Sequence, residues 1–84
     1  MTRPNESCEL RLPDFDLPET TARVSAWHAA AGQRVVEGER LVEIAAGDVT
    51  IELAAPLTGD LIELCAAVEQ PLVTGQLLAR IRPT

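Results

Sequence analysis

Residues 41–53 of the chain read LVEIAAGDVTIEL, a stretch near the centre of the sequence. Within it, residues 49–53 alternate between apolar and polar, which is typical of a strand with one buried face. Residues 41–44 follow the same pattern less regularly. Gly47 and Asp48 suit the central positions of a tight hairpin. The stretch therefore predicts two antiparallel strands joined by an exposed turn, which comprises Ala46, Gly47, Asp48 and Val49.

Further strands are predicted on both sides of this hairpin. Gly and Pro residues divide the chain into short segments rich in Val, Ile and Leu. Alanines 29–31 favour a helix, but Gly32 ends the cluster after three residues, well short of a stable helix. The expected strands are 9–12, 23–29, 41–45, 49–53, 61–66 and 77–82. Short strands separated by turns predict an all-β fold, either a small sandwich or a barrel.

An internal repeat indicates how these strands are arranged. Shifting the chain by 37 residues places 24–44 over 61–81, and seven of the 21 pairs are then identical, where chance would give about one or two. Each half is too small to bury its own apolar face, so we expect two small antiparallel sheets related by a pseudo-twofold axis. Gly38 and Gly75 occupy equivalent turns, where a positive φ is expected. The identical pairs are Ala29/Ala66, Ala30/Ala67, Gln33/Gln70, Val36/Val73, Gly38/Gly75, Leu41/Leu78 and Ile44/Ile81.

Length and composition indicate a single small globular domain. A chain of 84 residues has room for one core, and its 46% content of hydrophobic residues is too high for a disordered chain. No apolar run reaches 18 residues, so the sequence predicts no transmembrane helix. The first residues are polar and lack the apolar core of a signal peptide. The expected location is therefore the cytoplasm.

The charge of the chain excludes two classes of partner. Its net charge is −6, and all seven basic residues are arginine, so the sequence contains no lysine. An acidic domain without a basic stripe repels nucleic acid backbones and anionic membrane surfaces. We therefore expect neither nucleic acid nor membrane binding.

The sequence carries no pattern that indicates catalysis or metal binding. Cys8 and Cys65, without a secretion signal, are expected to be reduced, with a disulfide between them as the alternative. One histidine and two widely spaced cysteines match no set of metal ligands. The GxSxG, HExxH, CxxC and Walker motifs are absent. No catalytic residue and no metal ligand is predicted.

Several short motifs follow one another along the chain: LPDF at 12–15, VSAWH at 24–28, AGQRV at 31–35, EGERLVEI at 37–44, PLTG at 56–59 and VTGQLL at 73–78. Their order and spacing resemble the biotinyl/lipoyl-domain family, specifically its lipoyl branch. The resemblance implies a lipoyl-like domain over residues 9–82, folded as a flattened barrel-sandwich hybrid, with residues 1–8 as a flexible N-terminal arm. The sequence departs from the family pattern at residues Glu69, Gln70 and Pro71, where the family has a second Gly-Asp turn.

The resemblance also identifies the carrier turn and what it lacks. In active members this turn reads roughly E-T-D-K-A, and its lysine carries lipoate through an amide bond. The equivalent residues here are 45–49, with Asp48 at the lysine position and Gly47 at the position of the preceding aspartate. A carboxylate cannot form that amide, and no lysine elsewhere in the sequence can replace it. The M-K-M turn of biotin carriers is absent as well, so no covalent cofactor is expected.

Four residues each permit a structural and a functional interpretation. Trp27 is expected to pack at a sheet edge, with stacking on a ligand as the alternative. His28 and Cys65 are expected to be ordinary strand residues, with catalysis by His28 and redox chemistry at Cys65 as the alternatives. Asp48 is a suitable turn residue, and it could also serve as an acidic contact for a partner.

Three functional hypotheses follow. The first is a monomeric, non-catalytic lipoyl-like module that binds a protein without a covalent cofactor; the resemblance suggests components of a 2-oxoacid dehydrogenase-type system as partners. The second is a lipoyl carrier domain of such a complex whose attachment lysine is mutated or lost. The third is a small thiol enzyme using Cys8, Cys65 or His28, which requires a thiol pKa well below its usual value.

Overall fold

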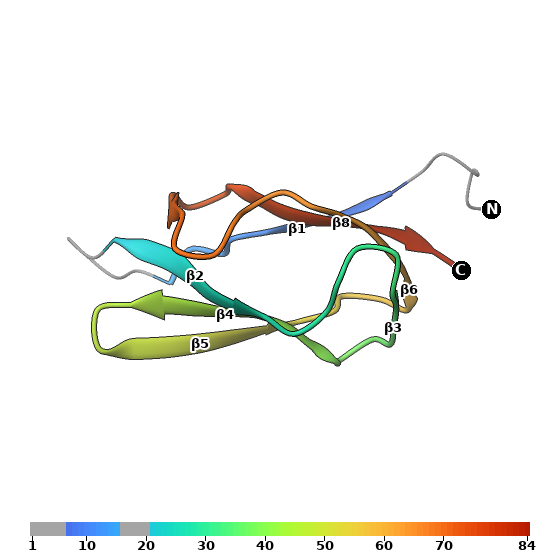
Figure 1. Cartoon of the computed structure of the whole chain (residues 1–84), viewed down its shortest axis with the longest axis horizontal. Coiled ribbons are helices and arrows are strands. Elements are labelled where there is room, and N and C mark those ends of the chain that lie inside the picture. The colour runs from blue at the N-terminus through green and yellow to red at the C-terminus, as the bar shows by residue number, and fades with distance from the viewer. Residues whose placement is uncertain (1–6, 16–20) are drawn as a thin grey trace.

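The computed structural model describes residues 7–15 and 21–84. Within these residues the chain forms strands and no helix, so the all-β prediction is confirmed (Figure 1). The strands make two antiparallel four-stranded sheets, ordered β1-β8-β6-β3 and β5-β4-β2-β7. Their bounds are β1 Cys8–Arg11, β2 Ala22–Trp27, β3 Arg34–Val35, β4 Arg40–Ala46, β5 Val49–Ala54, β6 Gly59–Leu64, β7 Pro71–Leu72 and β8 Leu77–Pro83.

All six predicted strands are present, with ends shifted by up to two residues. The prediction missed β3 and β7, since each is only two residues long and shows no alternation. Of the expected N-terminal arm, residues 1–6 lie outside the described part of the chain, and Cys8 begins β1.

The internal repeat is reproduced in the backbone. Adding 37 to the residue numbers of β2, β3 and β4 gives the bounds of β6, β7 and β8. The irregularity in β2 between Val24 and Ala26 recurs in β6 between Leu61 and Glu63. The strands β1 and β5, which pair with β8 and β4, are equivalent to each other. The predicted pseudo-twofold arrangement is therefore confirmed.

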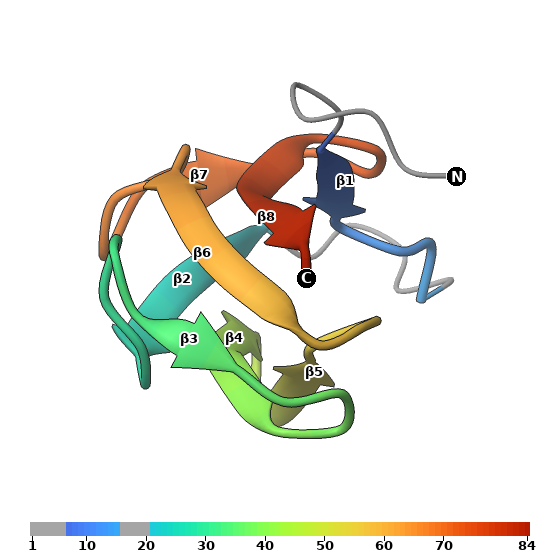
Figure 2. The same ribbon diagram turned by 90° about the vertical axis from the view of Figure 1, so that its right-hand side faces the viewer.

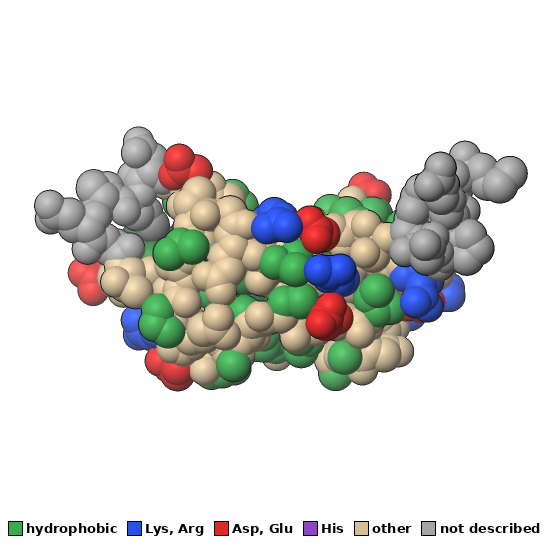
Figure 3. Space-filling model, turned by 90° about the horizontal axis from the view of Figure 1, so that it is seen from above, with side chains coloured by type: hydrophobic (Ala, Val, Ile, Leu, Met, Phe, Trp, Pro, Cys, Tyr) green, Lys and Arg blue, Asp and Glu red, His purple; other side chains and the backbone are tan. Residues whose placement is uncertain are grey.

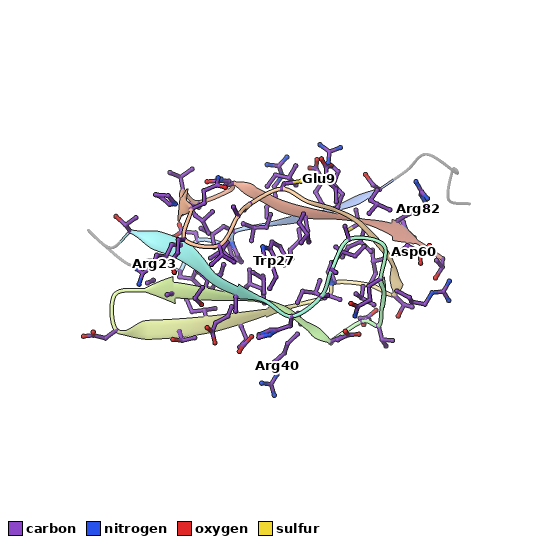
Figure 4. All side chains as sticks on the ribbon, in the orientation of Figure 1. Glu9, Arg23, Trp27, Arg40, Asp60 and Arg82 are labelled. Carbon is purple, nitrogen blue, oxygen red and sulfur yellow. The ribbon has the colours of Figure 1, made fainter. Side chains whose placement is uncertain are left out.

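The apolar faces of the two sheets bury a core in two clusters. One cluster contains Leu12, Val24, Val42, Ile44, Leu53, Ala66, Leu72 and Leu78. The other contains Ala29, Val35, Leu41, Ala55, Leu61, Ala79 and Ile81. Trp27 packs against both clusters and lies between the sheets (Figure 4). Its indole Nε1–H donates to the Ala66 carbonyl oxygen at 2.8 Å, so the side chain contributes both packing and a hydrogen bond to the core.

Equivalent turns connect the strands in the two halves. The positive φ expected at Gly38 and Gly75 is present, at 89° and 85°. Gly32 has a φ of 94°, and its repeat equivalent Glu69 has a φ of 72°, the one positive φ of a non-glycine residue in the described chain. The second half therefore keeps the turn of the first half without its glycine.

Candidate functional site

The turn between β4 and β5 is the candidate site, and it is a two-residue hairpin. Ala46 and Val49 pair across the strand ends, leaving Gly47 and Asp48 as the connection. Gly47 has a φ of 60°, whereas Asp48 has none in the positive range. A positive φ at the first central residue alone is typical of a type II′ turn, which matches the twist of the flanking strands. Asp48 is exposed at the turn, as predicted.

The turn lies at one end of an elongated molecule. The principal extents of the chain are 41, 20 and 19 Å, and the β4-β5 turn lies at the opposite end of the long axis from the C-terminus (Figure 1). The start of β1 is near the end of β8, where Cys8 pairs with Ile81. Of the four residues predicted to form the exposed turn, Ala46 is instead buried, because its side chain faces the core at the end of β4. Val49, directly opposite, is 46% exposed.

An acidic pair lies on the outer face of the sheet behind this turn. Glu43 of β4 and Glu52 of β5 are directly opposite each other. The Ser25 hydroxyl donates to Glu43 Oε2 at 2.6 Å, and His28 Nε2 lies 3.1 Å from Glu52 Oε2. Like charges in opposite positions destabilise a sheet. The Ser25 hydroxyl gives one of the two carboxylates a hydrogen-bond donor. The alternation of residues 49–53 indicated a polar face for this strand, but the pairing of the two acids was not predicted from the sequence.

The residues considered for catalysis are not arranged for it. His28 is exposed and contacts Glu52, and it has no nucleophile among the partners described. Burial raises the pKa of the Cys65 thiol, and the nearby Glu63 carboxylate raises it further. A raised pKa lowers the thiolate fraction at neutral pH and therefore the reactivity. Cys65 thus lacks the low pKa that the thiol-enzyme hypothesis requires, and both Cys8 and Cys65 are free thiols.

The described residues 7–15 and 21–84 contain neither a cluster of metal ligands nor a membrane-spanning helix. No group of three His, Cys, Asp or Glu side chains there is placed to hold a metal ion. None of the described segments forms a helix long and apolar enough to cross a membrane. The candidate site comprises the exposed β4-β5 turn and the acidic pair behind it.

Comparison with known proteins agrees with this geometry. Over residues 9–81 the sequence matches the biotin/lipoyl family, described as biotin-requiring enzyme. The chain is 34% identical over 73 residues to the dihydrolipoyllysine-residue succinyltransferase component of the 2-oxoglutarate dehydrogenase complex of Haemophilus influenzae, covering 87% of this chain and 18% of that protein. It is 32% identical over 76 residues to the same component of Escherichia coli K12, covering 90% of this chain and 19% of that protein.

A solved structure shares the fold. The solution structure of the lipoyl domain of the 2-oxoglutarate dehydrogenase complex from Azotobacter vinelandii superposes with a TM-score of 0.75 at 24% identity, over 88% of this chain and 94% of that one. The curated relatives are much longer, and the chain spans less than a fifth of each of the two named above. The family match extends over most of the chain and includes both sheets and the β4-β5 turn. The chain therefore belongs to the biotin/lipoyl domain family.

Proposed function

We propose that this domain is a non-catalytic lipoyl-like module that binds a protein partner and carries no covalent cofactor. Asp48 takes the position of the family's attachment lysine, on the turn formed with Ala46, Gly47 and Val49. The observation that carries the proposal is a well-formed, exposed hairpin turn in a chain of 84 residues without lysine. Attachment of lipoate or biotin requires an amine nucleophile, and a carboxylate cannot supply one.

The partners proposed are proteins of the 2-oxoacid dehydrogenase type. This proposal is supported by the names of the relatives, which are acyltransferase components of such complexes. A net charge of −6 and the acidic pair Glu43 and Glu52 favour a partner with a basic surface. We propose that the domain itself is a monomer.

The alternative is a lipoyl carrier domain whose attachment lysine is mutated or lost. This alternative is favoured by the form of the turn, which suits the presentation of a side chain. The turn has two residues, Gly47 with a positive φ and the exposed Asp48. Under this alternative, restoring the amine restores a substrate for the ligase. Under the first proposal, the surface around the turn has changed as well, with alanine at 45 and glycine at 47.

Intact-mass measurement after co-expression with a lipoate ligase, and separately with a biotin ligase, tests the proposal. We expect the chain to keep its unmodified mass with both enzymes. Added lipoyl or biotinyl mass on the unaltered chain would overturn the proposal. The matched variant Asp48→Lys distinguishes the two functions: complete lipoylation supports the lost-lysine alternative, and absent or trace lipoylation supports a separate interaction module.

A further inference from the structure

Strand β5 is an edge strand, and its outward-pointing backbone groups have no backbone partner among residues 7–15 and 21–84. It is the first strand of the sheet β5-β4-β2-β7, so β4 is its one neighbour in that sheet (Figure 2). The tight turn makes Ala46 and Val49 a hydrogen-bonded pair, and alternation makes Ile44 and Ile51 the next one. The peptide groups of Thr50 and Glu52 therefore point away from β4. Among the described residues, no backbone group pairs with them.

The other sheet has an equivalent edge strand, β1, and charged side chains there disfavour pairing with a further strand. Glu9 of β1 corresponds to Glu52 of β5 through the paired strands. Arg11 Nη2 lies 2.8 Å from Glu9 Oε1, and Arg80 Nη2 of β8 lies 3.8 Å from Glu9 Oε2. Arg11 also donates from Nη1 to the Gly75 carbonyl oxygen at 2.8 Å. Basic and acidic side chains lie next to each other on this face (Figure 3). Charged edge residues of this kind protect a strand from further pairing.

The edge at β5 lacks both of these cations. The position equivalent to Arg11 is Ala54, and the position equivalent to Arg80 is Glu43. Glu52 therefore faces a like charge, and the side chain in contact with its carboxylate is His28, which is a cation only when protonated. Arg40, opposite Ala54, points away from the sheets and makes no ion pair with Glu52 (Figure 4). Glu52 therefore lies on an edge strand with no arginine in the positions from which Arg11 and Arg80 pair with Glu9.

Of the inward-facing side chains of β5, Leu53 is buried in the core, whereas the two nearer the turn are only partly covered. Val49 is 46% exposed and Ile51 is half-buried against the core. In a strand added alongside β5, every second residue would lie beside Val49 or Ile51 on the inner face of the sheet. The intervening residues would lie on the outer face, beside Thr50 and Glu52. Apolar residues would pack most favourably beside Val49 and Ile51. An arginine or lysine would be most favourable beside Glu52, because it would pair with the carboxylate as Arg11 and Arg80 do with Glu9.

We propose that β5 is a docking edge for an extended segment of a protein partner, with alternating apolar and basic residues, which adds a strand next to Thr50 and Glu52. This inference rests on the proposed function, since it names the surface and the partner chemistry of the interaction module. The two fail separately, because ligase-dependent modification would overturn the proposed function without affecting strand pairing at β5.

Amide hydrogen exchange followed by NMR tests the docking edge on the whole chain. The probe is a short, capped peptide of alternating valine and arginine. Matched controls alternate valine with glutamate, or carry a proline that prevents an extended conformation. We expect the valine–arginine peptide to slow exchange of the Thr50 and Glu52 amides, and to leave the Glu9 and Arg11 amides unchanged. No slowing at Thr50 and Glu52, or equal slowing with the valine–glutamate peptide, would overturn the proposal.

Three variants separate the contributions of backbone and charge. Thr50→Pro removes an amide that does not pair with β4, and proline is tolerated at such edge positions, so the fold should persist while peptide binding is lost. Glu52→Gln should weaken binding roughly two- to fivefold, the range for one cross-strand charge pair. Ala54→Arg, which copies Arg11 of β1, should also weaken it. Glu9→Gln is the control on the other edge, and an effect as large as that of Glu52→Gln would contradict the assignment to β5.

Discussion

Glu69 occupies a turn position that the other half of the molecule gives to a glycine. Its φ is 72°, and the equivalent Gly32 has 94°. Side chains disfavour this left-handed region because Cβ approaches the carbonyl oxygen. Glu69 Oε2 lies 3.1 Å from Arg23 Nε, but both side chains are exposed, so this ion pair stabilises little. The second turn therefore keeps strain that the first turn avoids.

Replacing Glu69 with glycine should relieve this strain. We expect Glu69→Gly to raise the free energy of unfolding by about 1 kcal/mol, measured by urea denaturation. Glu69→Ala removes the ion pair with Arg23 and keeps the strain, so it should give no gain. Gly32→Ala is the reverse change at the equivalent position, where an added Cβ would meet no atom within 4 Å. It should lower stability by a similar amount, and equal stabilities for Glu69→Gly and Glu69→Ala would contradict this account.

At the scale of the elements, the two halves of the molecule differ at the first residue of β6, where the backbones of β6 and β8 approach closely. Gly59, the first residue of β6, pairs with Val35 of β3 and with Pro83 of β8. A Cβ at this position would collide with the Arg82 carbonyl oxygen and lie 3.0 Å from Ile81 Cγ2. The equivalent residue of β2 is Ala22, which has a Cβ. The close approach of backbones is thus specific to one end of the sheets.

The substitution Gly59→Ala should therefore destabilise the domain. The added methyl group can be accommodated only if β6 and β8 separate, which we expect to cost about 1–3 kcal/mol. For a domain of this size, thermal unfolding would shift down by roughly 4–8 °C per kcal/mol. Ala22→Gly is the matched control and should cost at most about 1 kcal/mol, through the greater freedom of the unfolded chain. A Tm for Gly59→Ala at or above that of Ala22→Gly would contradict the steric argument.

Alternation and the repeat made most of the strand arrangement predictable from the sequence. The outward direction of Glu43 and Glu52 follows from alternation, and a two-residue turn makes them opposite each other. The positive φ of Glu69 could have been inferred from its alignment with Gly32. The contact of His28 with Glu52 was not predictable, because the irregular pairing of β2 with β4 displaces the residues beyond Val24. The strands β3 and β7 are too short to show any periodicity.

At the scale of the whole molecule, the end of β8 and the start of β1 correspond to the two strand ends that the β4-β5 turn connects. The end of β8 at Pro83 is equivalent to Ala46 at the end of β4. The pair Cys8 and Ile81 is likewise equivalent to the pair Ile51 and Ile44. A chain that continued from β8 to β1 through a tight turn would therefore complete the pseudo-twofold symmetry. The β4-β5 turn lies at one end of the long axis, and the end of β8 and the start of β1 lie toward the other (Figure 1).

A circular permutant tests this symmetry. Pro83 would be joined to Ser7 through Gly-Asp-Val, copying residues 47–49, and the chain would be opened between Gly47 and Asp48. Because one exposed tight turn replaces another, we expect the same two sheets by NMR and a free energy of unfolding within about 1 kcal/mol of the original. A second permutant opened inside β4 at Ile44, a buried residue, should fail to fold, because the pairing of β4 with β2 and β5 is broken. If both permutants fail to fold, the continuous β4-β5 turn is required for folding, and the two ends of the molecule are not equivalent.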